Sequence, residues 1–286
     1  MSTGPKVSAL VSGGIPASPE VTPPGGAGVR LDPRPRSLQQ WWALTCRGTS
    51  KVFRNGELIF AFISPAFLAV CFYLPLRSIM NEAPGMNYGQ FLMPIIVLQS
   101  VGFAASSAAM RAANDGAEGI NTRFRVLPMS AAIPMLARTA TNLVLLAVSL
   151  LCAAVACLII GWRADGGVLG TVGLFALAAT IGVLFSLLAD GIGLLAGTPE
   201  ATSQAMTLPT LILGMLSTGF VPLAQFPEWI QPFVRNQPIS QFADSMRGLD
   251  AGTATWELVR PSLAWCVGLL VAAVVLLFLG ARKSRG

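Results

Sequence analysis

Residues 115–130 read DGAEGINTRFRVLPMS, a short polar stretch with three residues unfavourable to helices (Gly116, Gly119 and Pro128) and two arginines. It lies between two apolar runs, residues 91–110 and 139–161, each long enough to cross a lipid bilayer. A protein that only anchors something in a membrane has no need of a compact, basic, amphipathic hairpin at this place. A membrane protein moved by a separate cytoplasmic motor does need one, so this stretch predicts a docking point for such a partner.

The composition of the chain indicates an integral membrane protein. Of the 286 residues, 53% are hydrophobic and 11% are charged, and the mean hydropathy is +0.66. Soluble domains carry about 25% charged residues. Much of this protein's surface therefore does not face water.

Six stretches are apolar over roughly the 20 residues that a membrane-spanning helix needs. They are residues 58–76, 91–110, 139–161, 168–189, 203–222 and 262–280. They lack the alternating polarity of barrel strands, and isolated strands would leave backbone groups unpaired in lipid. The predicted fold class is an all-α integral membrane protein with six transmembrane helices.

The distribution of the 19 lysines and arginines predicts the orientation of these spans. With six spans both termini lie on one side, and fourteen basic residues fall there, those of the 115–130 loop included. The opposite side holds Arg77, Arg163, Arg235, Arg247 and Arg260. We expect cytoplasmic termini, a cytoplasmic loop and a location in the cell inner membrane. The net charge of +6 is then an orientation signal, and no nucleic-acid partner is expected.

Two segments precede the first span. Residues 1–36 are rich in Gly, Pro, Ser and Ala and have no sustained apolar run, which predicts a disordered cytoplasmic tail. Residues 37–56 place Trp41, Leu44 and Val52 on one side of a helix and basic residues on the other. This pattern predicts a helix lying on the membrane surface, although an ordinary anchor for the first span explains it equally well.

Residues 221–250 have an unusual pattern of prolines and aromatic residues. Prolines recur there every five or six residues, so a long helix cannot run through the region. With Pro227, Trp229 and Phe233, the pattern predicts a re-entrant segment that dips into the outer leaflet. A long structured extracellular loop with interfacial aromatic residues is the alternative.

Two stretches resemble an ABC-2-type permease: GINTRFRVLPMS at residues 119–130 and TGFVPLAQFPEWIQPFVRNQPISQFADSMRGL at residues 218–249. NGE at 55–57 and FVRNQPISQF at 233–242 are similar to the B-type subunit of actinobacterial, and particularly mycobacterial, daunorubicin-resistance exporters. The resemblance covers residues 37–286. It implies six helices (57–286) of type V exporter-like architecture, a connecting helix (37–56), a coupling helix in the loop 112–134, and extracellular re-entrant helices in 221–250.

The resemblance also implies partners. The family uses two permease chains, here a related or an identical second subunit, and two copies of a separate ABC ATPase. The chain contains no G-x-x-x-x-G-K-[ST] phosphate loop, and its only lysines are Lys6, Lys51 and Lys283. We therefore expect a subunit that is not an enzyme and binds no cofactor, with ATP and Mg bound by the partner. The chain has no histidine, so a metal site of the usual kind is not expected either.

The loop residues have distinct expected roles in coupling. Phe124 and Leu127 would be apolar anchors in a groove of the ATPase, with Arg123 and Arg125 at the charged rim. Glu118 would pair with a basic group of the partner or with Arg123. The alternative is an idle solvated loop.

Two of the predicted spans carry candidate substrate residues at helical spacing. They are Gln99, Phe103, Ser106 and Met110 in the second span, and Thr207, Thr210, Gly214 and Ser217 in the fifth. By resemblance these spans border the cavity between the two permeases. Helix packing by small and polar residues is the simpler interpretation of the same pattern.

Acidic residues occur near the ends of the spans and not at their centres, so an ion relay is not expected. We expect Asp190, at the edge of the fourth span, to be solvated. Glu57 would pair with Arg54 or Arg111, and the pairing closer in sequence is favoured.

These features predict the permease subunit of an exporter that carries a large hydrophobic or amphiphilic molecule outward. The cargo implied by the resemblance is a cell-envelope lipid such as phthiocerol dimycocerosate, or an anthracycline-like drug. The alternative function is a non-transporting membrane scaffold for lipid-synthesis enzymes.

Overall fold

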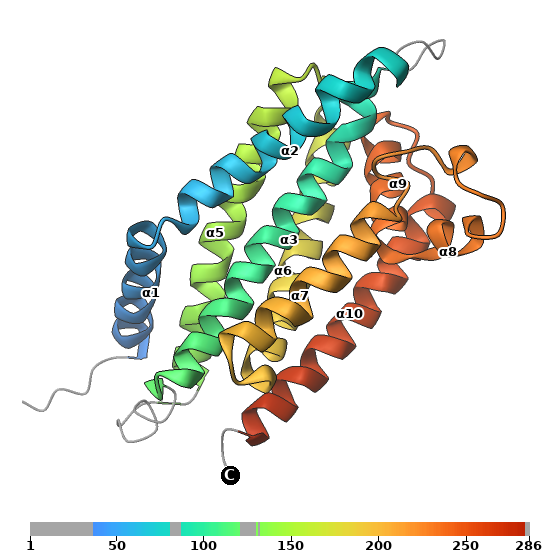
Figure 1. Cartoon of the computed structure of the whole chain (residues 1–286). Helices are drawn as coiled ribbons and strands as arrows, with labels where there is room; N and C mark the ends of the chain where they lie inside the picture. Colours follow the sequence, from blue (N-terminus) through green and yellow to red (C-terminus); the bar gives the residue numbers. More distant parts are fainter. Residues whose placement is uncertain (1–36, 81–86, 121–129, 131, 284–286) are drawn as a thin grey trace, which may run out of the picture. The chain divides into compact units, whose positions relative to one another are not determined.

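The computed structural model describes residues 37–80, 87–120, 130 and 132–283, and every regular element in these residues is a helix (Figure 1). The all-α fold class is therefore confirmed. The predicted tail, residues 1–36, lies outside the described residues. The helices are α1 (Ser37–Arg54), α2 (Glu57–Met80), α3 (Tyr88–Ala117), α5 (Ala132–Ile159), α6 (Gly167–Ala196), α7 (Pro199–Met215), the short 3-10 helix η1 (Leu223–Gln225), α8 (Gln231–Asn236), α9 (Pro238–Asp250) and α10 (Trp256–Lys283).

Five of these helices are long and apolar enough to cross a bilayer: α2, α3, α5, α6 and α10. They correspond to the predicted spans 58–76, 91–110, 139–161, 168–189 and 262–280. Helices α3 and α6 have 30 residues each, or about 45 Å at 1.5 Å per residue, which exceeds the roughly 30 Å of a bilayer's hydrocarbon core.

The remaining predicted span, residues 203–222, corresponds to α7, which has 17 residues and ends at Met215. The predicted end at residue 222 is wrong, because side chains near the start of α9 hold the chain after α7 in turns. The Gln237 amide donates to the carbonyl of Leu216, and the backbone N–H of Thr218 donates to Ser240 Oγ at 3.0 Å. At about 25 Å, α7 is shorter than the other spans, and its crossing of the membrane stays a prediction.

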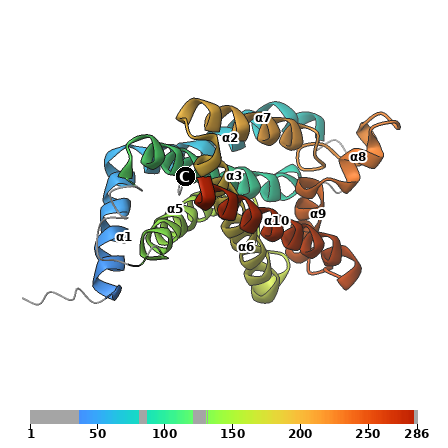
Figure 2. The ribbon, with the colours of Figure 1, turned by 90° about the horizontal axis from the view of Figure 1, so that it is seen from below.

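Helix α3 lies at the centre of the bundle. It packs against α2, α5, α6, α7 and α9, as the view in Figure 2 shows. In the most apolar window of α3, 67% of the residues are buried, against 17% in α2 and in α10. The two outer helices therefore present apolar side chains to their surroundings, as lipid-facing helices do.

Small residues bring α3 close to α6. A Cβ atom at Gly193 would overlap the carbonyl oxygen of Ala109 and lie 2.9 Å from the Cβ of Ala112. Close backbone approach of this kind is the usual basis of helix association in membranes. Gly197 follows the last residue of α6 and has a left-handed conformation, with φ 76°.

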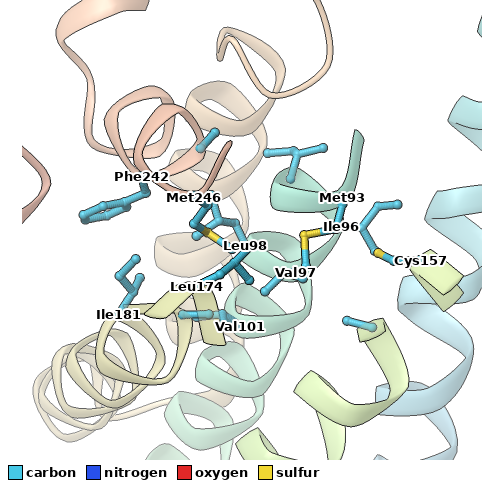
Figure 3. Packing of buried hydrophobic residues seen from close by; sticks show 14 of the residues in the cluster. Met93, Ile96, Val97, Leu98, Val101, Cys157, Leu174, Ile181, Phe242 and Met246 are labelled. Atoms are coloured by element: carbon cyan, nitrogen blue, oxygen red, sulfur yellow. The ribbon is translucent and has the colours of Figure 1, made fainter. Parts of the chain in front are cut away.

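The bundle has two ends with different additions. At one end, called here the α1 end, α1 joins α2, and α3, α6 and α10 finish (Figure 1). At the other end, called the α9 end, the part of the chain that connects α7 to α10 forms the short helices α8 and α9. The core extends towards the α9 end, where Phe242 and Met246 of α9 pack with Leu98 and Val101 of α3 and Leu174 of α6 (Figure 3).

Helix α1 occupies the place predicted for the connecting helix and packs against α5. Gly48 lies so close to Thr141 that a Cβ atom there would be 2.5 Å from the threonine Oγ1. Val52 is buried, whereas Leu38, Trp42 and Phe53 are each more than 60% exposed. This outer apolar side suits a helix that rests in a membrane surface.

Candidate functional site

An apolar cavity of about 300 Å³ lies between α3, α6 and α7, with the start of α9 and one residue of α10 at its border. The α7 wall of the cavity includes Pro209, which cannot donate a helical hydrogen bond, and the small residue Ala205. Its described lining is uncharged and consists mainly of aliphatic side chains. Such a space accommodates apolar groups and disfavours ionised ones, because a charge buried without a partner is costly.

Two predicted substrate residues, Gln99 of α3 and Thr210 of α7, line this cavity. Gly214 lies beside Gln99, whose amide nitrogen would be 3.1 Å from a Cβ atom at that glycine. Among the residues that the structure describes, no group is hydrogen-bonded to the Gln99 side chain. Gln99 is therefore the polar group best placed to meet a ligand in this cavity.

The structure does not bring the other predicted substrate residues into the cavity. Phe103 is 48% exposed, Thr207 is also exposed, and Ser106 and Met110 are half-buried outside the cavity lining. Ser217 is fully buried, and its hydroxyl donates to the carbonyl of Gly214 at 2.6 Å. Ser217 thus supplies a hydrogen-bond donor to a backbone carbonyl in the last turn of α7. Whether any of these side chains touches a substrate stays a prediction.

At the α1 end, a polar network connects four helices. Arg111 of α3 forms an ion pair with Glu57 of α2 and donates to Asn142 Oδ1 of α5 at 2.7 Å. Asn142 in turn donates from Nδ2 to Asp190 Oδ2 of α6 at 3.0 Å. Glu57 therefore pairs with Arg111, and the favoured pairing with Arg54 is wrong.

The expectation that Asp190 is solvated is also wrong, since it is only 5% exposed. Its partner Asn142 explains the difference, because an amide donor lets a carboxylate be buried among helices. Sequence analysis missed the role of Asn142. The available signal was an amide within the apolar run 139–161, where an unpaired polar group would be costly.

The predicted coupling residues fall mostly outside the described part of the chain. This holds for Arg123, Phe124, Arg125 and Leu127. Glu118 is described: it follows α3, is exposed, and its backbone N–H donates to the carbonyl of Asn114 at 2.9 Å. Its exposed side chain therefore lies at the α1 end, within the 115–130 stretch that is predicted to be a hairpin.

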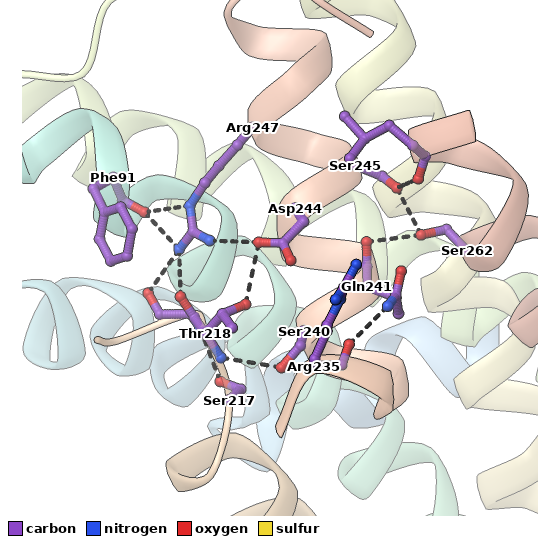
Figure 4. Close-up of polar contacts among 12 residues, drawn as sticks. Phe91, Ser217, Thr218, Arg235, Ser240, Gln241, Asp244, Ser245, Arg247 and Ser262 are labelled. Atoms are coloured by element: carbon purple, nitrogen blue, oxygen red, sulfur yellow. Dashed lines mark hydrogen bonds and ion pairs between the residues drawn. The ribbon is translucent and has the colours of Figure 1, made fainter. Parts of the chain in front are cut away.

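At the α9 end, Arg247 joins three segments (Figure 4). Its guanidinium donates to the backbone carbonyls of Phe91, Thr218 and Gly219 at 2.8–3.3 Å, and it pairs with Asp244 at 2.9 Å. Burial lowers the pKa of Arg247, and the neighbouring carboxylate of Asp244 acts in the opposite direction. The start of α3 and the end of α7 are thereby tied to α9.

The last residue of α9 is tied to the loop before α6. Trp162 donates from Nε1 to both carboxylate oxygens of Asp250 at 3.0 Å, and Gln90 donates to Oδ2 at 2.6 Å. Burial raises the pKa of Asp250, while these two hydrogen bonds act against the rise.

The residues predicted to be re-entrant lie at the periphery of this end. Pro227 is exposed, Trp229 is 80% exposed and Phe233 is 48% exposed. The predicted region contains η1, α8 and α9, with Pro232 and Pro238 in the first turns of α8 and α9, where proline suits a helix. Their depth in a membrane stays a prediction.

Comparison with known proteins supplies the context for this arrangement. The ABC-2 type transporter family matches residues 39–250. The doxorubicin resistance ABC transporter permease protein DrrB of Mycobacterium tuberculosis is 36% identical over 280 residues, which cover 93% of this chain and 96% of DrrB. The daunorubicin resistance ABC transporter permease protein DrrB1 of Streptomyces coeruleorubidus is 29% identical over 189 residues, covering 66% of each chain. A second M. tuberculosis protein, "Probable doxorubicin resistance ABC transporter permease protein DrrC", is 25% identical over 193 residues, covering 68% of this chain and 70% of its own.

Proposed function

Because this chain belongs to the ABC-2 type transporter family, we propose that it is the permease subunit of an exporter for large hydrophobic or amphiphilic molecules. A separate ABC ATPase, in two copies, supplies the energy, and a second permease chain completes the pathway. The chain lies in the cell inner membrane with both termini in the cytoplasm. The class of cargo is an anthracycline-like drug or a complex cell-envelope lipid.

The observation that carries this proposal is the uncharged cavity between α3, α6 and α7. Aliphatic side chains line it, and Gln99 and Thr210 provide polar groups on facing helices. Such a lining can hold a polycyclic or acyl group while one or two hydrogen bonds orient it. The names of the related permeases support a drug as cargo, since they refer to doxorubicin and daunorubicin resistance.

The polar network at the α1 end supports a mechanical role for this chain. Glu57, Arg111, Asn142 and Asp190 join α2, α3, α5 and α6 by ionic and hydrogen-bonded contacts. A push at the loop after α3 would therefore move four helices together. Movement of α3 and α6 against α7 changes the cavity, because those helices form its walls.

A cavity-filling variant tests the proposal. The complete transporter, purified with its ATPase and placed in proteoliposomes, is assayed for ATP-dependent doxorubicin transport and for stimulation of ATP hydrolysis by doxorubicin. We expect Thr210→Trp to reduce both by at least about tenfold, because the indole occupies space that the cargo needs. Basal ATP hydrolysis persists.

Leu211→Trp is the matched control, since Leu211 is the next residue of α7 and is 58% exposed. It should retain transport. Equal transport by the wild type and Thr210→Trp would contradict a cargo site in this cavity. If the wild-type transporter carries an envelope lipid but not doxorubicin, the cargo is the lipid.

A further inference from the structure

A second, chemically different pocket lies at the α1 end, between α1, α3, α5 and α6. It encloses about 90 Å³, and because a water molecule needs about 10–15 Å³ on the same measure, it has room for a small polyatomic group. Its lining differs from that of the apolar cavity because it is rich in charge. The basic residues that line it are Arg47, Lys51, Arg111 and Arg138.

Arg138 lacks a partner in this pocket. Its Nε and Nη1 atoms are buried, and no described residue accepts a hydrogen bond from either atom. A guanidinium carries a positive charge and offers only hydrogen-bond donors. Arg138 is half-buried as a residue, and an anion that accepts from its two buried donor atoms would offset their desolvation.

The carboxylates nearby attract Arg138 at longer range, but neither of them pairs with it directly. Two carboxylates, Asp115 and Asp190, line the pocket together with the four basic residues. Asp190 already accepts from Asn142, and Arg111 is paired with Glu57. In the described part of the chain neither Asp115 nor Asp190 lies within ion-pair distance of Arg138. The pocket therefore keeps a net positive charge, and its free donors point to an anionic ligand.

The position of α1 indicates where this anion comes from. Leu38, Trp42 and Phe53 expose apolar side chains on the outside of the same helix whose Arg47 and Lys51 line the pocket. An amphipathic helix of this kind rests in the headgroup layer of a bilayer. The anions concentrated at that depth are lipid phosphates, and basic pockets between membrane helices are known to hold such headgroups.

We propose that this pocket binds the phosphate of an anionic phospholipid, with Arg138 as its principal contact and Arg47 and Lys51 at its mouth. The lipid is a bound structural ligand that ties α1 to α5, and the inference rests on the membrane setting of α1, not on the transport function proposed above. Arg138 is a binding residue in this scheme, whereas Arg111 belongs to the network with Glu57.

The test measures lipid binding by the purified full-length permease in detergent. Short-chain phosphatidylglycerol is titrated while the thermal unfolding midpoint is followed, and the half-saturating concentration is read from the shift. We expect Arg138→Gln to raise that concentration by about tenfold or more, as for a lost charge-assisted hydrogen bond. Zwitterionic phosphatidylcholine should bind more weakly than phosphatidylglycerol, and inorganic phosphate should give no comparable shift.

Two further variants keep the test decisive. Lys51→Gln changes an exposed residue at the mouth, so it should fold normally and weaken binding by about fivefold. Arg260→Gln removes the same charge from an exposed position at the other end of the bundle and should leave binding unchanged.

Three results would overturn the proposal. The first is unchanged phosphatidylglycerol binding in both Arg138→Gln and Lys51→Gln. The second is inorganic phosphate saturating the protein as readily as the lipid does, which would make the site one for a free anion. The third is normal lipid binding by Arg138→Gln combined with loss of ATPase co-purification, which would assign the anion to an acidic group of the partner.

Discussion

The guanidinium carbon of Arg247 lies 3.8 Å above the centre of the Phe91 ring, while its nitrogens donate to the carbonyl of the same residue. One side chain of α9 thus binds the first turn of α3 both by its ring and by its backbone. This contact therefore links the central helix α3 to the segment that precedes α10.

Arg247→Met should destabilise the protein by about 3 kcal/mol, because it removes a desolvated cation–π contact and several hydrogen bonds to carbonyl groups. Unfolding of the purified protein in detergent measures this. Arg235→Met is the control, since Arg235 is an exposed residue of α8 and should be neutral within about 0.5 kcal/mol. Equal effects of the two substitutions would refute the role given to Arg247.

Asp250 should make stability depend on pH. Burial raises its folded-state pKa above the unfolded value of about 3.9. Its stabilising contribution is therefore full below the unfolded pKa and is lost as the pH rises through the raised folded pKa. Unfolding midpoints across this range should show the wild type losing stability relative to Asp250→Asn as the pH increases. Glu257→Gln changes an exposed position, and its unfolding midpoint should follow that of the wild type across the pH range. If the unfolding midpoint of Asp250→Asn also follows the wild type, the role given to Asp250 is wrong.

Asn142→Leu should cost about 3 kcal/mol, because it leaves Asp190 without its donor and Arg111 without one acceptor. A double-mutant cycle in unfolding experiments checks the connection. Asp190→Leu should cost less in the Asn142→Leu background than in the wild type, with a coupling energy of about 1–3 kcal/mol. Additive effects would show that the two residues act independently.

Gly193→Ala should destabilise the bundle by about 1–3 kcal/mol, because the added methyl group meets the backbone of α3 at Ala109. Gly268→Ala is a matched control in α10, where the added Cβ has no atom within 4 Å; it should be neutral or stabilising by up to about 1 kcal/mol. Thermal unfolding compares the two, and similar losses would mean that the close approach of α3 and α6 is unimportant.

Phe124→Asp and Leu127→Asp should each lower ATP-driven transport by about tenfold or more, since an apolar anchor in a protein interface contributes about 2 kcal/mol or more. The assay is co-purification with the ATPase followed by transport in proteoliposomes. Trp229→Asp, an exposed residue at the α9 end, should leave assembly intact. Normal assembly and normal transport in both loop variants would remove the coupling role from this segment.

The sequence alone determined the class of the protein and the places of its long helices. Roughly 20 consecutive apolar residues have few alternatives in lipid, where backbone groups must be paired within the segment. The prediction therefore succeeded for α2, α3, α5, α6 and α10, and α1 also occupies its predicted place. The polar hairpin sequence and the 218–249 stretch were sufficient to indicate the ABC-2 family.

Only the tertiary structure decided which polar side chains meet. Gln99 and Thr210 line the cavity, whereas Phe103 and Thr207 are exposed. Helical spacing predicts which residues share a face of a helix, but it does not predict which other helix packs against that face. Asp190 is buried because Asn142 of another helix is there to donate to it, and α7 stops at Met215 because Gln237 and Ser240 bind the chain beyond it. Hydropathy is a property of a segment by itself, whereas burial and hydrogen bonding depend on residues far away in the chain.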